Sequence, residues 1–352
     1  MHLSIEPISS VDHIDDLATI IQLSCIFHGE IFESDLQWDD DLIFQTFLEA
    51  RKAEGDDADT LNDYEAEPNR TIQLAKEQMV HDARSILHER SILMSVHFPF
   101  EISSDIGKLL SLKEVVDGSG TAYLWLLMFD LLNSDTNYIQ LSADDENFFK
   151  KRFYAVFEII ACYALSGRNE NYVWCTGRIR SASSYLNLLR RILGKVGSGV
   201  VKELEKLDEN QINVNEAGVD GVALSTVDGV VGNDAEIIIL QSTVQKGQRR
   251  TKVVGPGQVT RFKSFFEKNP RAAVHGALAI PYEGTAIDQA DCAEANCIYL
   301  PRSEILKYIG REPTDTGKRL GTWRLDAIMR SHNKVLSERV RLITVDGQLP
   351  IG

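Results

Sequence analysis

The stretch that most constrains the fold is 216–263, EAGVDGVALSTVDGVVGNDAEIIILQSTVQKGQRRTKVVGPGQVTRFK. Its pattern predicts a strand carrying Asp220, a glycine-rich turn, and a second strand, EIIILQST, with Gln241 near its end. A basic loop follows, and a helix is expected to begin near Pro256. Neighbouring strands that end in an acid and an amide, followed at once by cations, suit a divalent metal ion and a phosphate group.

The length of the chain predicts two domains. Single hydrophobic cores rarely grow beyond roughly 250–300 residues, and this chain has 352. With 43% hydrophobic and 25% charged residues, its composition is that of an ordinary globular protein. The polar segment NSDTN and the acidic segment SADDEN indicate a boundary, which gives domains at 1–145 and 146–352.

The sequence lacks the features of membrane and secreted proteins. No apolar run reaches the roughly 18 residues that a membrane helix needs, and the first residues lack the basic-then-apolar order of a signal peptide. We therefore expect no membrane contact and a cytoplasmic location. The five cysteines show no framework spacing and are expected to be reduced thiols rather than disulfides.

The net charge of −15 hides an asymmetry between the two halves. Residues 1–150 contain 9 Lys and Arg against 30 Asp and Glu, a net of −21, whereas 151–352 contain 28 against 22, a net of +6. The first half would repel nucleic acid and the second would accept it, because phosphate contacts dominate such binding. The acidic half is also compatible with a role in solubility alone.

The N-terminal domain is predicted to be mostly α-helical. Apolar residues at helical spacing predict helices at 12–28, 39–53, 70–90 and 121–132. The acidic segment 54–69 is expected to be a loop or a frayed helix end, and 91–102 a short strand or extended segment that Pro99 ends. The histidines lack the spacing of a metal motif, and no catalytic constellation is evident in this half.

The second half is predicted to be a mixed α/β sheet with helices on its faces. Helices at 148–167 and 181–196 precede the two strands and the helix of the opening stretch. After them we expect a strand at 272–282, a helix at 286–295, a strand at 297–301 and a helix at 302–310.

This half resembles the PD-(D/E)xK restriction-endonuclease-like superfamily, particularly Mrr-like members and their relatives in bacterial anti-phage defence. The matching pieces, over about 150–310, are the helix with Glu158, the GVDGVAL strand with Asp220, the IILQST strand with Gln241, and the helix VGPGQVTRFKSFF followed by VHGALAIPY. The resemblance implies a restriction-endonuclease-like mixed sheet flanked by helices, and a divalent-metal-dependent nuclease.

Phosphodiester hydrolysis gives these residue types a chemical reason. Mg²⁺ or Mn²⁺ takes oxygen ligands, which the Asp220 carboxylate, the Gln241 amide and the Ser242 carbonyl could supply. Glu158 could add a ligand directly or through water. The ion would polarise a phosphoryl oxygen and lower the pKa of a bound water.

The sequence departs from the family pattern at its lysine, because the position two residues after the amide is Thr243. Lys246 is the nearest replacement for orienting or deprotonating the water, and Lys252 is the next. The loop cations are expected to bind nucleic acid: Arg249, Arg250 and Lys252.

The Gly-Pro-Gly before QVTRFK favours a helix whose N-terminus points at the site and binds phosphate through free amides. Gln258 and Arg261 on its first turns are further candidates for contact with the nucleic-acid backbone. Purely structural roles stay open: Asp220 could cap a turn, Gln241 could satisfy backbone groups in a buried strand, and the basic loop could be solvated.

The sequence therefore predicts a metal-dependent nuclease in an anti-phage defence or restriction system, and its expected substrate is DNA rather than RNA. The alternative is a catalytically inactive nuclease-fold protein that binds nucleic acid or a partner protein, and a structural subunit of a larger complex is a third interpretation. The acidic domain is expected to dock a partner protein or to mask the basic face. A homo-oligomer is compatible with the sequence.

Overall fold

The fold is described from a computed structural model. The residues that the structure describes are 4–5, 14–105, 107–113, 122–123, 125–127, 129–130, 139–140, 143–168, 172–176, 181–208, 211, 219–225, 231, 235–244, 253 and 255–309.

The chain folds into two compact units. Among the described residues, unit 1 contains those of 1–120 and 131–142, and unit 2 contains 121–130 and those from 143 onward. The change at 142–143 lies close to the predicted boundary at 145–146. The described residues of 122–130 are helical and buried, as predicted, but they belong to unit 2.

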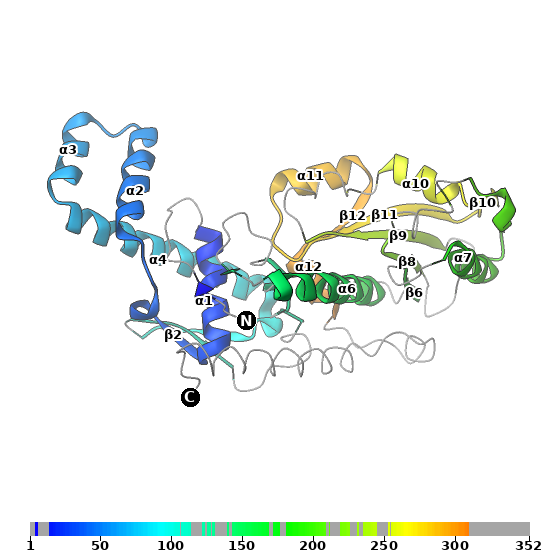
Figure 1. Ribbon diagram of the computed structural model, residues 1–352, viewed down its shortest axis with the longest axis horizontal. Coiled ribbons are helices and arrows are strands. Elements are labelled where there is room, and N and C mark those ends of the chain that lie inside the picture. Colours follow the sequence, from blue (N-terminus) through cyan, green and yellow to red (C-terminus); the bar gives the residue numbers. More distant parts are fainter. Residues whose placement is uncertain are drawn as a thin grey trace. The chain divides into compact units, whose positions relative to one another are not determined.

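Unit 1 combines helices with small antiparallel sheets (Figure 1). Its helices are α1 (Ile14–His28), α2 (Asp40–Glu54), α3 (Ala58–Ala66) and α4 (Pro68–Met94). Strands β2 (Glu30–Phe32), β3 (Phe100–Ile102) and β4 (Lys108–Leu112) form a sheet in the order β2-β4-β3, and β1 (Ser4–Ile5) pairs with β5 (Ile139–Gln140). The helical prediction therefore misses β1, β2, β4 and β5, which are too short to show a clear alternation of apolar and polar residues.

The acidic segment 54–69 is a helix over most of its length, not a loop. Asp57 caps α3, because its side chain accepts a hydrogen bond of 2.9 Å from the backbone amide of Thr60. Acidic residues stabilise the first turn of a helix, where amides lack partners. Gly55, with φ of 95°, ends α2 just before this cap.

Residues 91–102 are also more helical than predicted. Helix α4 continues through Met94, and only Phe100–Ile102 forms a strand. The end of α4 is marked by Ser95, which has a positive φ of 48°. The apolar residues of SILM extend the helix, and nothing in their spacing distinguishes a strand from a buried helical turn.

Unit 2 contains the nine elements predicted for the second half, in the predicted order. They are α6 (Ala143–Arg168), α7 (Ala182–Val196), β8 (Gly221–Leu224), β9 (Glu236–Ser242), α10 (Pro256–Lys263), β11 (Ala273–Ala279), α11 (Ala286–Glu294), β12 (Cys297–Leu300) and α12 (Arg302–Ile309). Three short strands are additional: β6 (Tyr172–Cys175), β7 (Val200–Val201) and β10 (Phe266–Lys268).

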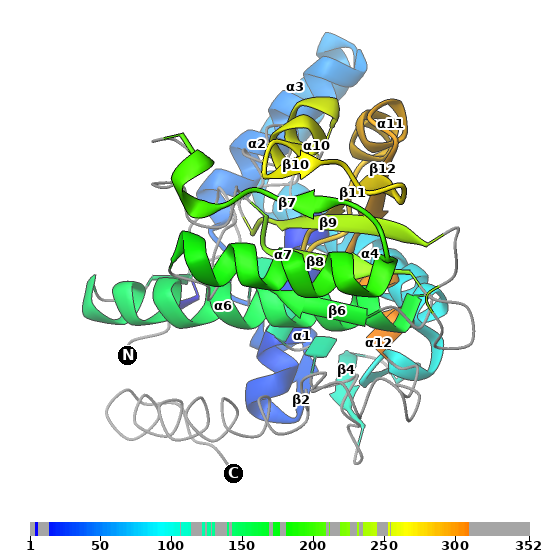
Figure 2. The same ribbon diagram turned by 90° about the vertical axis from the view of Figure 1, so that its right-hand side faces the viewer.

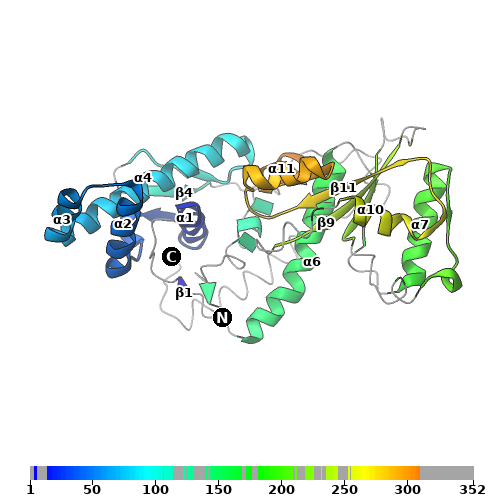
Figure 3. The same ribbon diagram turned by 90° about the horizontal axis from the view of Figure 1, so that it is seen from above.

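The central sheet of unit 2 is mixed, with strand order β12-β11-β9-β8-β6. β9, β11 and β12 are parallel, whereas β8 is antiparallel to both β9 and β6. Figure 1 shows α10 and α11 on one side of the sheet and α6 and α12 on the other. Seen from above, α10 and α11 follow one another along the same face (Figure 3). A coarse α/β class with a mixed sheet and flanking helices is thus confirmed.

One face of this sheet packs on a large apolar core. Residues of α7, α10 and α11 contribute to it together with alternate residues of the strands, such as Val222, Ile239 and Leu278. Figure 2 shows α7, β7 and β10 at the end of unit 2 nearest the viewer. All five cysteines are free, as predicted, and the structure places all of them in buried positions. Among the described residues, no helix is long and apolar enough to span a membrane.

Candidate active site

Asp220 and the end of β9 lie side by side. Asp220 immediately precedes β8, and its backbone amide donates a hydrogen bond of 2.8 Å to the carbonyl of Leu240. Its carboxylate oxygen Oδ2 accepts two more, from the amide of Ser242 at 2.6 Å and from the Ser242 hydroxyl at 3.0 Å. The carboxylate is therefore held in a fixed orientation at the shared edge of two strands.

Gln241 lies beside this pair. The paired register ends at Gly221 and Leu240, and Gln241 stands between Leu240, whose carbonyl accepts from the Asp220 amide, and Ser242, which bonds to the Asp220 carboxylate. The Gln241 side chain is buried, with 7% of the residue exposed. The backbones of Asp220 and Gln241 are thus neighbours, whereas the Gln241 side chain lies on the sheet face of Ile239 and Leu278, opposite the face that α6 covers.

Glu158 is a residue of helix α6, and this helix packs against strands β6, β8 and β9. It lies one turn before Cys162 on the same face of the helix. Gly221 makes this approach close, because a Cβ atom there would lie 2.6 Å from the Cys162 sulfur. A hydrogen bond with Cys175 and burial raise the pKa of Cys162 well above its ordinary value, and the negative charges of Asp220 and Glu158 raise it further. The charges of Asp220 and Glu158 therefore both raise the pKa of the same thiol, that of Cys162.

The predicted metal ligands, Glu158, Asp220 and Gln241, have the chemical groups that a hard divalent cation prefers. Two carboxylates and an amide supply only oxygen atoms, which Mg²⁺ and Mn²⁺ prefer. Among the described residues, no group of three His, Cys, Asp or Glu side chains is placed to hold a metal ion. The predicted set contains only two such side chains, so Gln241 and water or substrate oxygens would have to complete the coordination.

Thr243 stands at the position where the resemblance leads us to expect a lysine. Thr243 is 7% exposed, and its backbone amide donates a hydrogen bond of 3.1 Å to the carbonyl of Ala279. A lysine that serves the site must therefore reach it from elsewhere. The candidate cations of the basic loop lie outside the described residues: Lys246, Arg249, Arg250 and Lys252.

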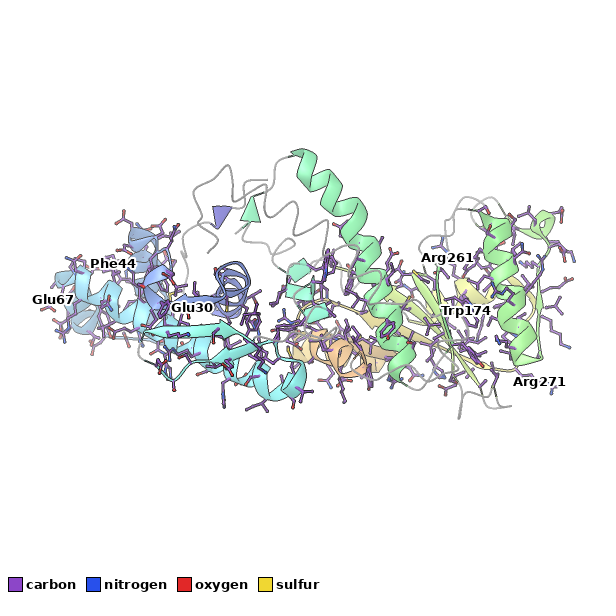
Figure 4. All side chains as sticks on the ribbon, turned by 90° about the horizontal axis from the view of Figure 1, so that it is seen from below. Glu30, Phe44, Glu67, Trp174, Arg261 and Arg271 are labelled. Atoms are coloured by element: carbon purple, nitrogen blue, oxygen red, sulfur yellow. The ribbon has the colours of Figure 1, made fainter. Side chains whose placement is uncertain are left out.

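Helix α10 begins at Pro256 as predicted, and its N-terminal cap, Gly255, lies near the end of α11. A Cβ atom added to Gly255 would lie 3.8 Å from the Cβ of Ala295, which follows α11. The Gln258 side chain accepts a hydrogen bond of 3.2 Å from the Gly255 amide, so it caps its own helix. Arg261 is exposed on the same helix (Figure 4).

Strand β6, which the sequence analysis did not predict, is the edge strand of the central sheet and pairs with β8. Thr176, directly after β6, donates its backbone amide to the Asp220 carbonyl at 2.9 Å, and its hydroxyl donates to the Val219 carbonyl. β6 also carries Cys175. The alternation in YVWC, with a β-branched residue and two aromatic residues, is a strand signal that could have located it.

Comparisons of the chain with protein-family models, with curated proteins and with solved structures gave no match. A functional assignment therefore depends on the residues and geometry of the chain itself.

Proposed function

We propose that unit 2 is a divalent-metal-dependent nuclease of the PD-(D/E)xK type, acting on DNA, in a bacterial anti-phage defence or restriction system. The observation that carries the proposal is the Asp220 carboxylate, which two hydrogen bonds from Ser242 hold in place next to Gln241 in the chain of β9. Its support is that the Asp220 carboxylate, a residue type expected for such a site, is held by hydrogen bonds where β8 begins and β9 ends.

In this proposal, Asp220 and Gln241 hold the metal ion, and Glu158 contributes directly or through water. The bound ion supplies Lewis-acid activation of the phosphodiester and of a water nucleophile. The hydrogen bonds from Ser242 keep the Asp220 carboxylate oriented, so that little reorganisation is needed when a ligand arrives. Lys246 is proposed to orient the nucleophilic water or to stabilise the charge that develops on the phosphate.

A cleavage assay tests this proposal. Plasmid and oligonucleotide DNA would be incubated with the protein and Mg²⁺ or Mn²⁺, for wild type, Asp220→Asn, Lys246→Ala and the control Glu304→Gln. Glu304 is a carboxylate on α12 that pairs with Lys307 at 3.2 Å. We expect Asp220→Asn to lower the rate at least about 100-fold, since even groups behind metal ligands are worth roughly 10- to 100-fold. Cleavage that survives Asp220→Asn would refute this site.

A second candidate is a catalytically inactive protein with the same fold that binds nucleic acid or a partner protein. The buried Thr243 favours it, because a nuclease of this type needs a cation near the metal and this position provides none. Wild-type protein that binds DNA but cleaves none with either metal would establish this second function. A chain that neither binds nor cleaves would point to a structural subunit of a larger complex.

We also propose that the acidic unit 1 docks a partner protein or limits access of nucleic acid to unit 2. Deleting residues 1–145 would not test this cleanly, because 121–130 belongs to unit 2. A full-length variant is better: Asp59→Asn, Asp63→Asn and Glu65→Gln neutralise exposed acids of α3. DNA affinity that rises in this variant at low salt would support masking, and unchanged affinity would exclude masking by these acids.

A further inference from the structure

At the end of β8 away from Asp220, unit 2 carries a pair of aromatic rings. Tyr172 lies across from Leu224 in the register, so it is at the opposite end of this strand from Asp220. The rings of Tyr172 and Trp174 are stacked, with centroids 6.4 Å apart and an angle of 24° between their planes. Both residues are half-buried at the rim of the apolar core.

Cations adjoin these rings. The ammonium group of Lys195, in the last turn of α7, lies 4.5 Å from the centre of the Tyr172 ring. Arg191 is one turn earlier on the same helix and is exposed. After α7 the chain turns, and the Ser198 hydroxyl accepts a hydrogen bond of 3.0 Å from the backbone amide of Arg271.

The cationic surface continues onto the small β7–β10 sheet. Lys268 of β10 pairs with Val200 of β7, and Pro270 lies against Gly199, where a Cβ atom would be 3.0 Å from the proline nitrogen. Arg191, Lys195, Lys268 and Arg271, which we call the basic rim, are therefore connected through α7, the turn after it and β10. All four residues are exposed.

The carboxylates near the basic rim are mostly engaged with other cations. Glu267 pairs with Lys206 at 2.8 Å, and Glu203 pairs with Arg190 at 2.9 Å. Within the described part of the chain, no carboxylate pairs with any member of the basic rim. The positive charge of the rim is thus available to an external anion.

From this arrangement we infer that the basic rim and the Tyr172–Trp174 pair bind a single-stranded segment of nucleic acid, separately from the Asp220 site. Exposed cations along a surface match the phosphates of one strand. The Tyr172 ring already adjoins Trp174 and Lys195, so Trp174 is the ring of the pair on which an unpaired base would stack. A duplex would use the cations but not the rings, because its bases are already stacked. Binding of a single strand at this surface does not require hydrolysis, so its test is independent of the proposed nuclease chemistry.

The test is a binding assay on the full-length protein in EDTA, where metal-dependent cleavage cannot occur. Fluorescein-labelled oligo(dT) and oligo(U) would be titrated and followed by anisotropy at several salt concentrations. The main variant is Arg191→Gln, Lys195→Gln and Arg271→Gln together. The control is Lys307→Gln on α12, an exposed lysine that pairs with Glu304.

We expect the triple variant to bind oligo(dT) at least about tenfold more weakly than wild type. The slope of log K against log salt concentration should also be shallower by about 2. Each phosphate contact on a single strand contributes roughly 0.7 to this slope, and the variant removes three cations. Lys307→Gln should bind as wild type does. Equal affinity of the triple variant and wild type, with both folded by circular dichroism, would overturn the inference.

The rings are tested separately with Trp174→Leu and Trp174→Phe. Phenylalanine keeps a stacking face, so its affinity should stay near wild type, whereas leucine should weaken oligo(dT) binding by about 5- to 100-fold, the range of one lost base–aromatic stack. If Trp174→Leu has no effect and a DNA hairpin binds as tightly as oligo(dT), the single-strand assignment is wrong. Competition by polyglutamate as strong as that by oligo(dT) would instead indicate an acidic protein ligand and would also overturn it.

Discussion

Asp220 and Ser242 are joined by two hydrogen bonds that link the start of β8 to the end of β9. One comes from the backbone amide of Ser242 and survives any substitution except proline. The other comes from the hydroxyl and can be removed by itself. The pair therefore allows the orientation of the Asp220 carboxylate to be tested without removing its charge.

We predict that Ser242→Ala lowers the free energy of unfolding by about 1–3 kcal/mol, because a partly buried hydrogen bond to a charged group is lost. Urea denaturation followed by circular dichroism measures this change. Ser91→Ala is the control, since the Ser91 hydroxyl bonds only to the His88 carbonyl on the exposed side of α4. Alanine favours helix there, so little or no loss is expected. Equal effects of the two substitutions would contradict the prediction.

Gly167 sets the distance between α6 and α12. A Cβ atom there would lie 2.2 Å from the backbone carbonyl oxygen of Tyr308, and a backbone atom cannot move aside as a side chain can. We expect Gly167→Ala to destabilise unit 2 by about 1–3 kcal/mol or more. Its thermal midpoint should fall accordingly.

The matched control for Gly167 is Gly194→Ala in α7. Gly194 is helical, and among the described residues no heavy atom beyond the adjoining residues and the backbone of its own helix lies within 4 Å of a Cβ built there. Alanine should therefore stabilise this helix by about 0.5–1 kcal/mol. A Gly167→Ala variant as stable as the Gly194→Ala variant would show that α6 and α12 do not pack this closely.

The thiol of Cys25 should make stability fall at alkaline pH. Burial raises its pKa to about 12, from 9.0, against a smaller opposing effect of Lys108. The folded protein thus holds this proton more tightly than the unfolded chain does. The resulting contribution is complete below about pH 9 and is lost between about pH 9 and 12, by up to roughly 1.4 kcal/mol per pH unit.

Comparing wild type with Cys25→Ala in urea at pH 7.5 and pH 10 measures this contribution. Alanine leaves a cavity at both pH values, but it cannot ionise. The stability advantage of wild type should therefore be smaller at pH 10. An advantage that stays constant between the two pH values would mean that the Cys25 thiol keeps an ordinary pKa.

Arg302 forms a buried ion pair in unit 2. Its side chain is fully buried, and its guanidinium lies 3.2 Å from Asp130 and 3.6 Å from Glu283. Arg302→Met removes the cation that pairs with the Asp130 carboxylate, which is 2% exposed. We expect a loss of about 3–5 kcal/mol.

A double-mutant cycle checks that the loss at Arg302 comes from the charge on Asp130. Adding Asp130→Asn to Arg302→Met should cost less than Asp130→Asn costs in wild type, because the carboxylate has already lost its cation. Urea unfolding of the four proteins gives the coupling energy. Strictly additive effects would show that the two side chains do not interact.

Local features of the sequence determined the elements of unit 2. The nine predicted helices and strands follow one another as predicted, because apolar periodicity and turn residues act over short distances in the chain. The same local signals failed where they were ambiguous. In 54–69, acidic residues suggested a loop, yet Asp57 uses its charge to begin α3.

The tertiary structure decided which residues meet. Strand pairing places Asp220 beside Ser242, brings the unpredicted β6 against β8, and packs Gly221 against Cys162. The sequence proposed Asp220, Gln241 and Glu158 as a group through a resemblance, but it could not reveal the hydrogen bonds that orient the carboxylate. Those bonds depend on register, and register is fixed by burial across the whole sheet rather than by any one strand.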